Sequence, residues 1–363
     1  MKKKILLIVP SLQGGGAERV MVTLANHFDR NRYVPILALG LVKGPYLKDL
    51  ARDVTIHSLG GAWRARYAVP AVLRMVWSLR PHVVLSTLGL NLAVALARPF
   101  FPPGTRVILR AGTTVSAYLK ISSSNACLKT LGYKWLYRLA DTVICQSDFM
   151  LNDMAINFSL PRQKLVRIYN PVDIERIRTL AAQMGNPFVG TGPHLLAIGN
   201  LYRVKGFEVL LKASKLVRVH HPRTTLTILG EGEDMAKLKR LAQGLGILEA
   251  TCFLGFQSNP YPYLKHADLF VSSSRYEGFS NVILESLALG TPVVATDCPG
   301  GNREVIEEGL NGWLAKVDDV ESLAQTICRG IGNGVTLDAA AIQARCEARF
   351  SVNHIVELYQ DQF

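Results

Sequence analysis

The sequence predicts an α/β protein composed of two doubly wound domains with parallel sheets. Short apolar runs alternate with amphipathic stretches along the chain, which is typical of parallel sheets covered by helices. The 363 residues are enough for two hydrophobic cores. In addition, a glycine-rich turn at residues 14–16 follows the first apolar run, where ligands bind in such sheets.

The first half of the chain is expected to form the first sheet. Its last apolar run ends in a turn-forming stretch at residues 169–173. Residues 174–193 then lack a strong pattern and finish in Gly-Thr-Gly-Pro, which is typical of a domain boundary. The expected strands are residues 5–9, 34–39, 54–57, 83–86, 107–109, 142–146 and 165–168.

A second series of strands begins after this boundary. The predicted domains are residues 1–175 and 190–340, and residues 341–363 are expected to form a helix that packs back toward the first domain. The helical pattern itself begins near residue 339 and runs to residue 359. The expected strands of the second domain are residues 194–199, 225–230, 251–254, 269–272 and 292–295.

The glycine-rich turn suits an anionic ligand but matches neither common phosphate-binding motif. Glycine lets backbone N–H groups approach a ligand, and a helix start favours negative charge. A P-loop needs Lys and then Ser or Thr after its last glycine, where this chain has Ala17 and Glu18. A dinucleotide fingerprint needs glycine where Arg19 stands and an acidic residue after the second strand, and this chain has neither. A tight turn without a ligand is the alternative.

Positive charge is concentrated in the first half. Residues 1–180 carry 25 Lys and Arg and 9 Asp and Glu, and residues 181–363 carry 16 and 19, so the net charges are +16 and −3. Arg64, Arg66 and Arg74 lie among apolar and aromatic residues. This mixture fits helices on an anionic membrane surface, and a merely solvated basic face is the alternative. Nucleic acid ranks last, because no zinc-finger or RNP sequence occurs.

Cysteine spacing and hydropathy favour a cytoplasmic protein. The apolar run after the three N-terminal lysines is too short for a signal peptide. The most apolar later window, residues 83–101, is interrupted by Asn91, Arg98 and Pro99, so no transmembrane helix is expected. Scattered thiols without CxxC favour reduced cysteines over zinc ligands; they are Cys127, Cys145, Cys252, Cys298, Cys328 and Cys346.

Loops after strands of the second domain carry the residues with the clearest chemistry. Glu277 precedes a helix expected to begin near Ser280 or Asn281, and Glu285 lies inside that helix. The N–H groups of a helix start can hold a diphosphate, and carboxylates can accept hydrogen bonds from sugar hydroxyls. Lys205 could neutralise phosphate charge. The alternative makes Glu277 a partner of the helix dipole and Glu285 a solvated helix residue.

This ordered set resembles the retaining, nucleotide-sugar-dependent glycosyltransferases with the GT-B fold (glycosyltransferase family 4-like). The resemblance extends over nearly the whole chain, and its most specific part is the E-x7-E pattern of Glu277 and Glu285 with Gly278. The opening GGGAER is most similar to members that build lipid-linked oligosaccharides or surface polysaccharides. Supporting matches are residues 14–18, 168–173, 205–206 and 290–294, Glu304, and residues 311–312.

The resemblance implies two Rossmann-like domains that face each other across a cleft, with a role for each matched residue. Glu285 would bind the ribose hydroxyls, Glu277 would lie near the donor sugar, and Lys205 would stabilise the departing diphosphate. Glycines of the 14–16 turn would close over the donor from the other domain. The implied donor-binding residues are Gly15, Gly16, Asn200, Gly278, Phe279, Ser280, Asn281 and Glu285.

Two positions depart from the family pattern. Asn200 stands where the family usually has Arg, and residues 110–114 read Arg-Ala-Gly-Thr-Thr where a His is frequent. We therefore add Arg203 to Lys205 and Glu277 as a catalytic residue, on the hypothesis that its guanidinium replaces the absent charge. The alternative is a solvated loop arginine.

The implied reaction moves a sugar from a nucleoside diphosphate, UDP in the first instance, to a hydroxyl of a lipid-linked or glycan acceptor. The anomeric configuration would be retained. No Asp-x-Asp occurs in the chain, so we expect no metal and no cofactor, and Lys205 with the helix amides would carry the charge. The protein is expected to be peripheral on the inner face of the cell membrane. Rival functions are a sugar-nucleotide hydrolase or epimerase of the same fold and a non-catalytic, membrane-docked partner in a glycan assembly complex.

Overall fold

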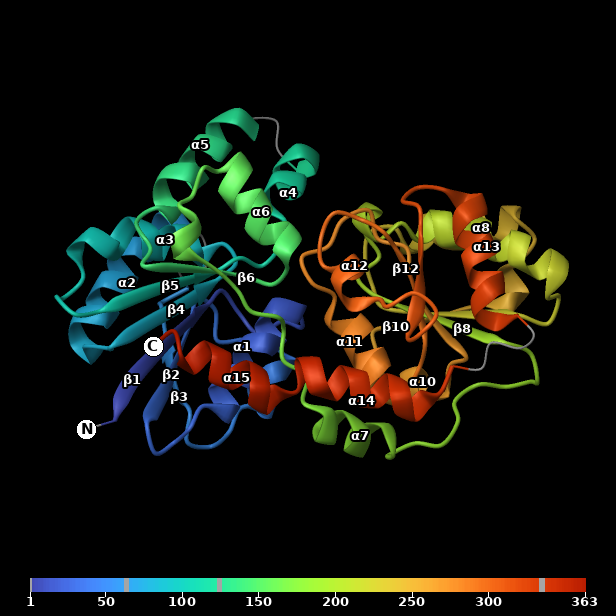
Figure 1. The fold of residues 1–363 in the computed structure, drawn as a ribbon, viewed down its shortest axis with the longest axis horizontal. Helices are drawn as coiled ribbons and strands as arrows, with labels where there is room; N and C mark the ends of the chain where they lie inside the picture. Colours follow the sequence, from blue (N-terminus) through green and yellow to red (C-terminus); the bar gives the residue numbers. More distant parts are fainter. Residues whose placement is uncertain (1, 62–64, 123–125, 333–336) are drawn as a thin grey trace. The chain divides into compact units, whose positions relative to one another are not determined.

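The computed structural model describes residues 2–61, 65–122, 126–332 and 337–363 (Figure 1). The chain forms two compact units, of which unit 1 comprises Met1–Pro171 with Val352–Phe363, and unit 2 comprises Val172–Ser351. Each unit contains one parallel sheet. The predicted fold class, two doubly wound α/β domains, is therefore confirmed.

The sheet of unit 1 has the strand order β3-β2-β1-β4-β5-β6-β7. Its seven strands coincide with the seven expected apolar runs. They are β1 (Lys3–Val9), β2 (Tyr33–Leu39), β3 (Thr55–Ser58), β4 (Val83–Thr87), β5 (Arg106–Arg110), β6 (Thr142–Cys145) and β7 (Leu165–Arg167).

Helices cover both faces of this sheet, because successive side chains of a strand point to opposite faces. In β1, Leu6 and Ile8 join the core beneath one helical layer, whereas Ile5, Leu7 and Val9 join the core beneath the other. The first layer comprises α2 (Ala65–Leu79), α3 (Leu90–Ala97), η2 (Arg98–Phe100), α4 (Val115–Ser122), α5 (Ala126–Tyr137), α6 (Asp148–Asn157) and η3 (Arg162–Lys164). The second comprises α1 (Gly16–His27), η1 (Pro45–Asp49) and α15 (Val352–Gln360).

The sheet of unit 2 has the strand order β10-β9-β8-β11-β12-β13. Its strands are β8 (His194–Ile198), β9 (Thr225–Leu229), β10 (Thr251–Gly255), β11 (Leu269–Ser272), β12 (Val293–Thr296) and β13 (Gly312–Ala315). The first five coincide with expected strands. The edge strand β13 was not expected, because its four residues include glycine and alanine and give little periodicity.

Helices also cover both faces of the second sheet. One core lies beneath α8 (Phe207–His220), α9 (Met235–Gly244) and α13 (Val320–Ile331). On the other side α7 (Ile174–Ala181) packs on α10 (Tyr261–His266) and α11 (Asn281–Ala288), and α11 packs on α14 (Ala339–Phe350). Short elements are η4 (Arg203–Lys205), η5 (Leu248–Ala250) and α12 (Asn302–Val305).

The C-terminal helical segment is divided at Ser351. Its backbone there is extended (φ −55°, ψ 143°) and forms a bridge with Val172. As a result α14 belongs to unit 2 and α15 to unit 1. The chain thus crosses between the units after Pro171 and after Ser351, whereas the boundaries predicted from the sequence lie at residues 175, 190 and 341.

Among the described residues, no helix combines the length and apolarity that a bilayer crossing requires.

Candidate active site

Two of the candidate catalytic side chains meet at the carboxyl ends of neighbouring strands in unit 2. Lys205 follows β8 and Glu277 follows β11, and these two strands pair directly. Lys205 Nζ lies 2.6 Å from Glu277 Oε1, with side-chain exposures of 28% and 14%. The Ser274 hydroxyl donates to the same carboxylate oxygen at 2.7 Å. The pair is thus partly shielded from water, which strengthens its attraction.

The turn that carries Lys205 is held from the segment after β11. The Ser273 hydroxyl donates to the Lys205 carbonyl at 2.8 Å. Gly206 has φ +63°, and a Cβ there would lie 2.2 Å from the Ser273 carbonyl oxygen. Only glycine therefore permits this close approach between the turn and the strand end.

The loop that carries Glu277 is held from the loop after β12. The Glu277 amide donates to the Pro299 carbonyl at 3.0 Å, and the Gly301 amide donates to the Gly278 carbonyl at 3.0 Å. Gly300 has φ +143°, and a Cβ there would lie 2.4 Å from the Glu277 carbonyl oxygen. These bracing residues were not predicted from the sequence, although the two consecutive glycines Gly300 and Gly301 are a signal of close backbone approach.

The helix expected near Ser280 is α11, which begins at Asn281 and has Ser280 as its N-cap. Glu285 is 7% exposed and Phe279 is 8% exposed. Glu285 is thus buried in the helix and is not the solvated residue of the alternative interpretation. Its carboxylate lies in unit 2, as do Lys205 and Glu277.

Asn200 and Arg203 lie in the same loop as Lys205 and are both exposed. The Arg203 carbonyl accepts a hydrogen bond from the guanidinium of Arg275. The Lys205–Glu277 pair forms without the Arg203 side chain. The hypothesis that Arg203 replaces an absent charge stays a prediction.

The glycine-rich turn belongs to unit 1, and its amides bind a carboxylate of the chain itself. The amides of Gly14 and Gly15 donate to Glu18 Oε2 at 2.9 and 3.1 Å. The Ser11 hydroxyl donates to Glu18 Oε1 at 3.0 Å, and Glu18 is 7% exposed. Any ligand that uses these two amides must displace Glu18, so the role of Gly15 and Gly16 toward the donor stays a prediction. The spacing of Glu18 three residues after Gly15 is that of a capping box.

A cysteine lies behind the Glu277 loop. Burial and the neighbouring Glu277 carboxylate raise the pKa of Cys298 to about 12. Its thiol is therefore protonated at neutral pH and is a poor nucleophile.

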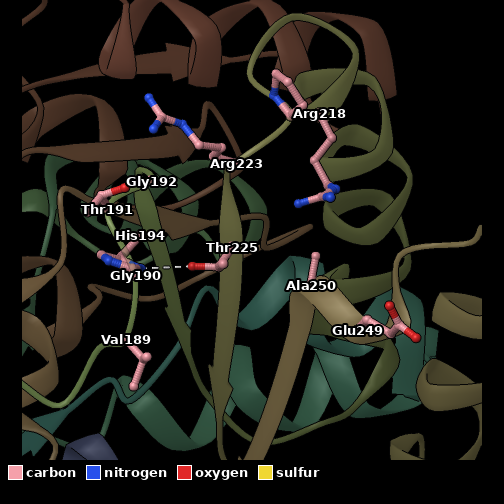
Figure 2. Close-up of a pocket in the computed structure, with 11 residues that line it drawn as sticks. Val189, Gly190, Thr191, Gly192, His194, Arg218, Arg223, Thr225, Glu249 and Ala250 are labelled. Carbon is pink, nitrogen blue, oxygen red and sulfur yellow. Dashed lines mark hydrogen bonds between the residues drawn. The ribbon is translucent and has the colours of Figure 1, made fainter.

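A surface pocket of about 380 Å³ lies at the opposite end of the second sheet. It is bordered by His194 and Thr225, the first residues of β8 and β9, and by Arg218, Arg223 and Glu249 (Figure 2). His194 Nδ1 lies 2.8 Å from Thr225 Oγ1. Because Lys205 and Glu277 follow the carboxyl ends of their strands, this pocket is not their site.

No group of three or more His, Cys, Asp and Glu suited to a metal ion occurs within residues 2–61, 65–122, 126–332 and 337–363. That the reaction needs no metal and no cofactor stays a prediction.

Comparison with known proteins relates both units to glycosyltransferases. Residues 14–176 match the family described as Glycosyltransferase Family 4, and residues 183–344 match Glycosyl transferases group 1. The chain is 28% identical over 338 residues to the N-acetylgalactosamine-N,N'-diacetylbacillosaminyl-diphospho-undecaprenol 4-alpha-N-acetylgalactosaminyltransferase of Campylobacter jejuni. That match covers 89% of this chain and 88% of that protein.

Two further relatives match a part of the sequence or the fold. The lipopolysaccharide core biosynthesis glycosyltransferase LpsE of Rhizobium meliloti is 38% identical over 135 residues, which cover 37% of this chain and 38% of that protein. The crystal structure of HepE from Anabaena in complex with UDP is similar in fold, with a TM-score of 0.77, 21% identity and 99% of both chains covered.

Proposed function

Because the chain belongs to the family 4-like glycosyltransferases with the GT-B fold, we propose that it transfers a sugar with retained configuration from a nucleoside diphosphate. The proposed donor is a UDP-linked hexose or N-acetylhexosamine, and the proposed acceptor is a lipid-linked or polysaccharide hydroxyl at a membrane surface. The observation that carries the proposal is the Lys205–Glu277 pair at the strand ends of unit 2, in which Glu277 lies shortly before the start of α11 at Asn281.

The donor would bind along the strand ends of unit 2. Glu285 would accept hydrogen bonds from the ribose hydroxyls, and Glu277 would do the same for the donor sugar. The amides of residues 278–281 would hold the sugar and the diphosphate at the start of α11. UDP is the first choice of nucleotide because it is the ligand of the Anabaena protein with the similar fold.

Lys205 would stabilise the leaving diphosphate. Glu277 holds Nζ at 2.6 Å, and an ammonium fixed in this way would need little reorganisation to stabilise negative charge that grows on a bound diphosphate. In the transfer, the bond from the anomeric carbon to the acceptor oxygen forms while its bond to the diphosphate oxygen breaks. The acceptor proton passes to the leaving phosphate. The proposal includes no metal and no cofactor.

The charge distribution of unit 1 supports a membrane-bound acceptor. Residues 54–140 contain eleven Lys and Arg and no Asp or Glu. Within this stretch large side chains are exposed on the helical layer of unit 1, namely Tyr67 (61%), Trp77 (47%), Phe100 (64%) and Trp135 (63%). Aromatic residues mixed with arginines fit the interface of an anionic bilayer.

The contacts of Trp77 give this surface local order. Its Nε1 donates to the Phe100 carbonyl at 2.9 Å, and the Arg80 guanidinium lies 4.4 Å from its ring centroid. Of the arginines named from the sequence, Arg74 is exposed on α2. Arg64 and the side chain of Arg66 lie outside the described part of the chain.

A thermal-shift panel of nucleotide sugars tests the donor. A bound donor stabilises the native state, so the melting temperature is expected to rise with one nucleotide sugar well above all others. UDP release from that donor, with and without a lipid acceptor, then distinguishes transfer from hydrolysis or epimerisation. If no nucleotide sugar shifts the melting temperature, the proposed function is wrong.

A further inference from the structure

Arg275 joins the two loops that carry Lys205 and Glu277, and its guanidinium binds three separate segments. Nη2 lies 2.6 Å from Glu208 in the first turn of α8, and Nε lies 2.8 Å from Asp318 in the loop between β13 and α13. Nη1 donates to the Arg203 carbonyl. The side chain is 19% exposed. The planar fork of arginine suits such a contact, because it donates in several fixed directions at once.

The backbone of Arg275 extends the same contact. Its amide donates to the Val204 carbonyl at 2.8 Å. Together with the hydrogen bond from Nη1, two successive carbonyls of η4 are bound just before Lys205. A lysine stem is long and flexible, so the position of its amine depends on how firmly its backbone is fixed.

The two carboxylates keep Arg275 in this position. Burial lowers the pKa of Arg275, but the hydrogen bonds and the negative charges of Asp318 and Glu208 together outweigh burial and raise the pKa above its ordinary value. Asp318 has a left-handed backbone with φ +57°, which is uncommon for a residue other than glycine. The guanidinium is thus permanently charged and is bound on two sides by acids that do not belong to the Lys205–Glu277 pair.

We propose that Arg275 is a positioning residue for Lys205. It fixes the 203–205 turn so that Lys205 Nζ meets the diphosphate of the donor. The proposal rests on the proposed function, since it assumes that Lys205 binds the diphosphate. If Arg275 only stabilised the fold, loss of its guanidinium would weaken the binding of all ligands. If it positions Lys205, the loss should weaken only the binding of ligands with a diphosphate, and the effect should depend on Lys205.

Calorimetric binding of UDP and of uridine, which lacks the diphosphate, tests this role in the full chain. Arg275→Met is expected to weaken UDP binding on the order of tenfold, the size of one lost charge-assisted hydrogen bond, and to leave uridine binding unchanged. In a chain that already carries Lys205→Met, the same change should have less than about a twofold effect, because the residues act as one unit. Arg275→Lys keeps a positive charge for Glu208 or Asp318 but loses the fork, and we expect it to show the same loss specific to UDP.

Arg345→Met is the matched control, because Arg345 is also paired in unit 2, with Glu307 at 2.7 Å, but has no contact with η4 among the described residues. It should leave both affinities unchanged. Equal weakening of UDP and uridine by Arg275→Lys, or an undiminished effect of Arg275→Met in the Lys205→Met chain, would overturn the positioning role. If the unmodified chain binds neither UDP nor any other nucleoside diphosphate, the proposed function itself fails. That result is distinct from normal UDP binding by the Arg275 variants, which would refute the inference alone.

Discussion

Lys205 and Glu277 are 72 residues apart in the sequence, yet their side chains form an ion pair of 2.6 Å between Nζ and Oε1. The contact exists because β8 and β11 are neighbours in the sheet although two strands lie between them in the chain. Each residue follows the carboxyl end of its strand, where open α/β sheets bind ligands.

Loss of the Lys205 charge should slow the reaction. With the identified donor, Lys205→Met is expected to lower turnover, because it should raise the activation free energy by about 2–3 kcal/mol. This is the typical effect of removing one preorganised group that stabilises developing charge. Steady-state kinetics of UDP release measures this. Lys215→Met, on the exposed side of α8, is the matched control and should retain turnover. Normal turnover by the Lys205 variant would remove Lys205 from the mechanism.

The buried Glu285 should determine nucleotide affinity. If it holds ribose hydroxyls, Glu285→Ala should weaken UDP and the UDP-sugar equally, by about 1.5–3 kcal/mol for lost charge-assisted hydrogen bonds. Calorimetry with both ligands gives the two values, and the melting temperature of the free variant shows whether it folds. Unchanged UDP affinity in a folded variant would contradict the ribose assignment.

Variants of Arg203 and Asn200 together test whether a second positive charge acts beside Lys205. If Arg203 turns inward when the donor binds, Arg203→Ala should cost about 2–3 kcal/mol in turnover. Arginine introduced by Asn200→Arg should then restore the Arg203→Ala enzyme, because it places the charge where the family usually has it. A fully active Arg203→Ala enzyme would show that Lys205 and the helix amides stabilise the leaving group without it.

Unit 1 should bind anionic bilayers through its exposed aromatic residues. Sedimentation with vesicles should require acidic lipid and weaken as salt rises, since screening shortens the field. Trp77→Ser with Trp135→Ser should reduce binding. The control is Phe256→Ser in unit 2, which removes an aromatic side chain of comparable exposure (53%). Equal binding to neutral vesicles at all salt concentrations would instead indicate hydrophobic insertion.

The cysteines should differ sharply in reactivity. Burial raises the pKa values of Cys145, Cys298 and Cys346 to about 12, so at pH 8 only on the order of one thiol in ten thousand is the reactive thiolate. Cys252 is exposed. Iodoacetamide at pH 8, followed by peptide mass spectrometry, should therefore modify Cys252 long before Cys298, and in urea both should react. Rapid modification of Cys298 in the folded protein would contradict its burial behind the Glu277 loop.

Local patterns in the sequence were sufficient to predict most of the strands. Most of the strands were visible as apolar runs because a strand buried on both faces needs consecutive apolar residues, as in β1 and β4; β3 is largely exposed and β10 is partly exposed. The start of α11 was also visible, since Ser280 and Asn281 follow a glycine and precede an apolar run. The edge strand β13 and the division of the last helix at Ser351 escaped prediction, because both depend on which segments pack beside them.

The sequence by itself determined the residue types of the candidate site. These are a lysine and a carboxylate that follow strands, and a second carboxylate inside the next helix. Only the tertiary structure decided their partners. The order β8-β11 brought Lys205 to Glu277, and the guanidinium of Arg275 reached η4, α8 and the Asp318 loop at once. In unit 1, the glycine-rich turn predicted only that backbone amides could bind an anion. The structure shows that the carboxylate of Glu18 accepts hydrogen bonds from the Gly14 and Gly15 amides. The physical reason is that propensity and periodicity act over a few residues, whereas strand order and side-chain pairing depend on contacts between segments far apart in the chain.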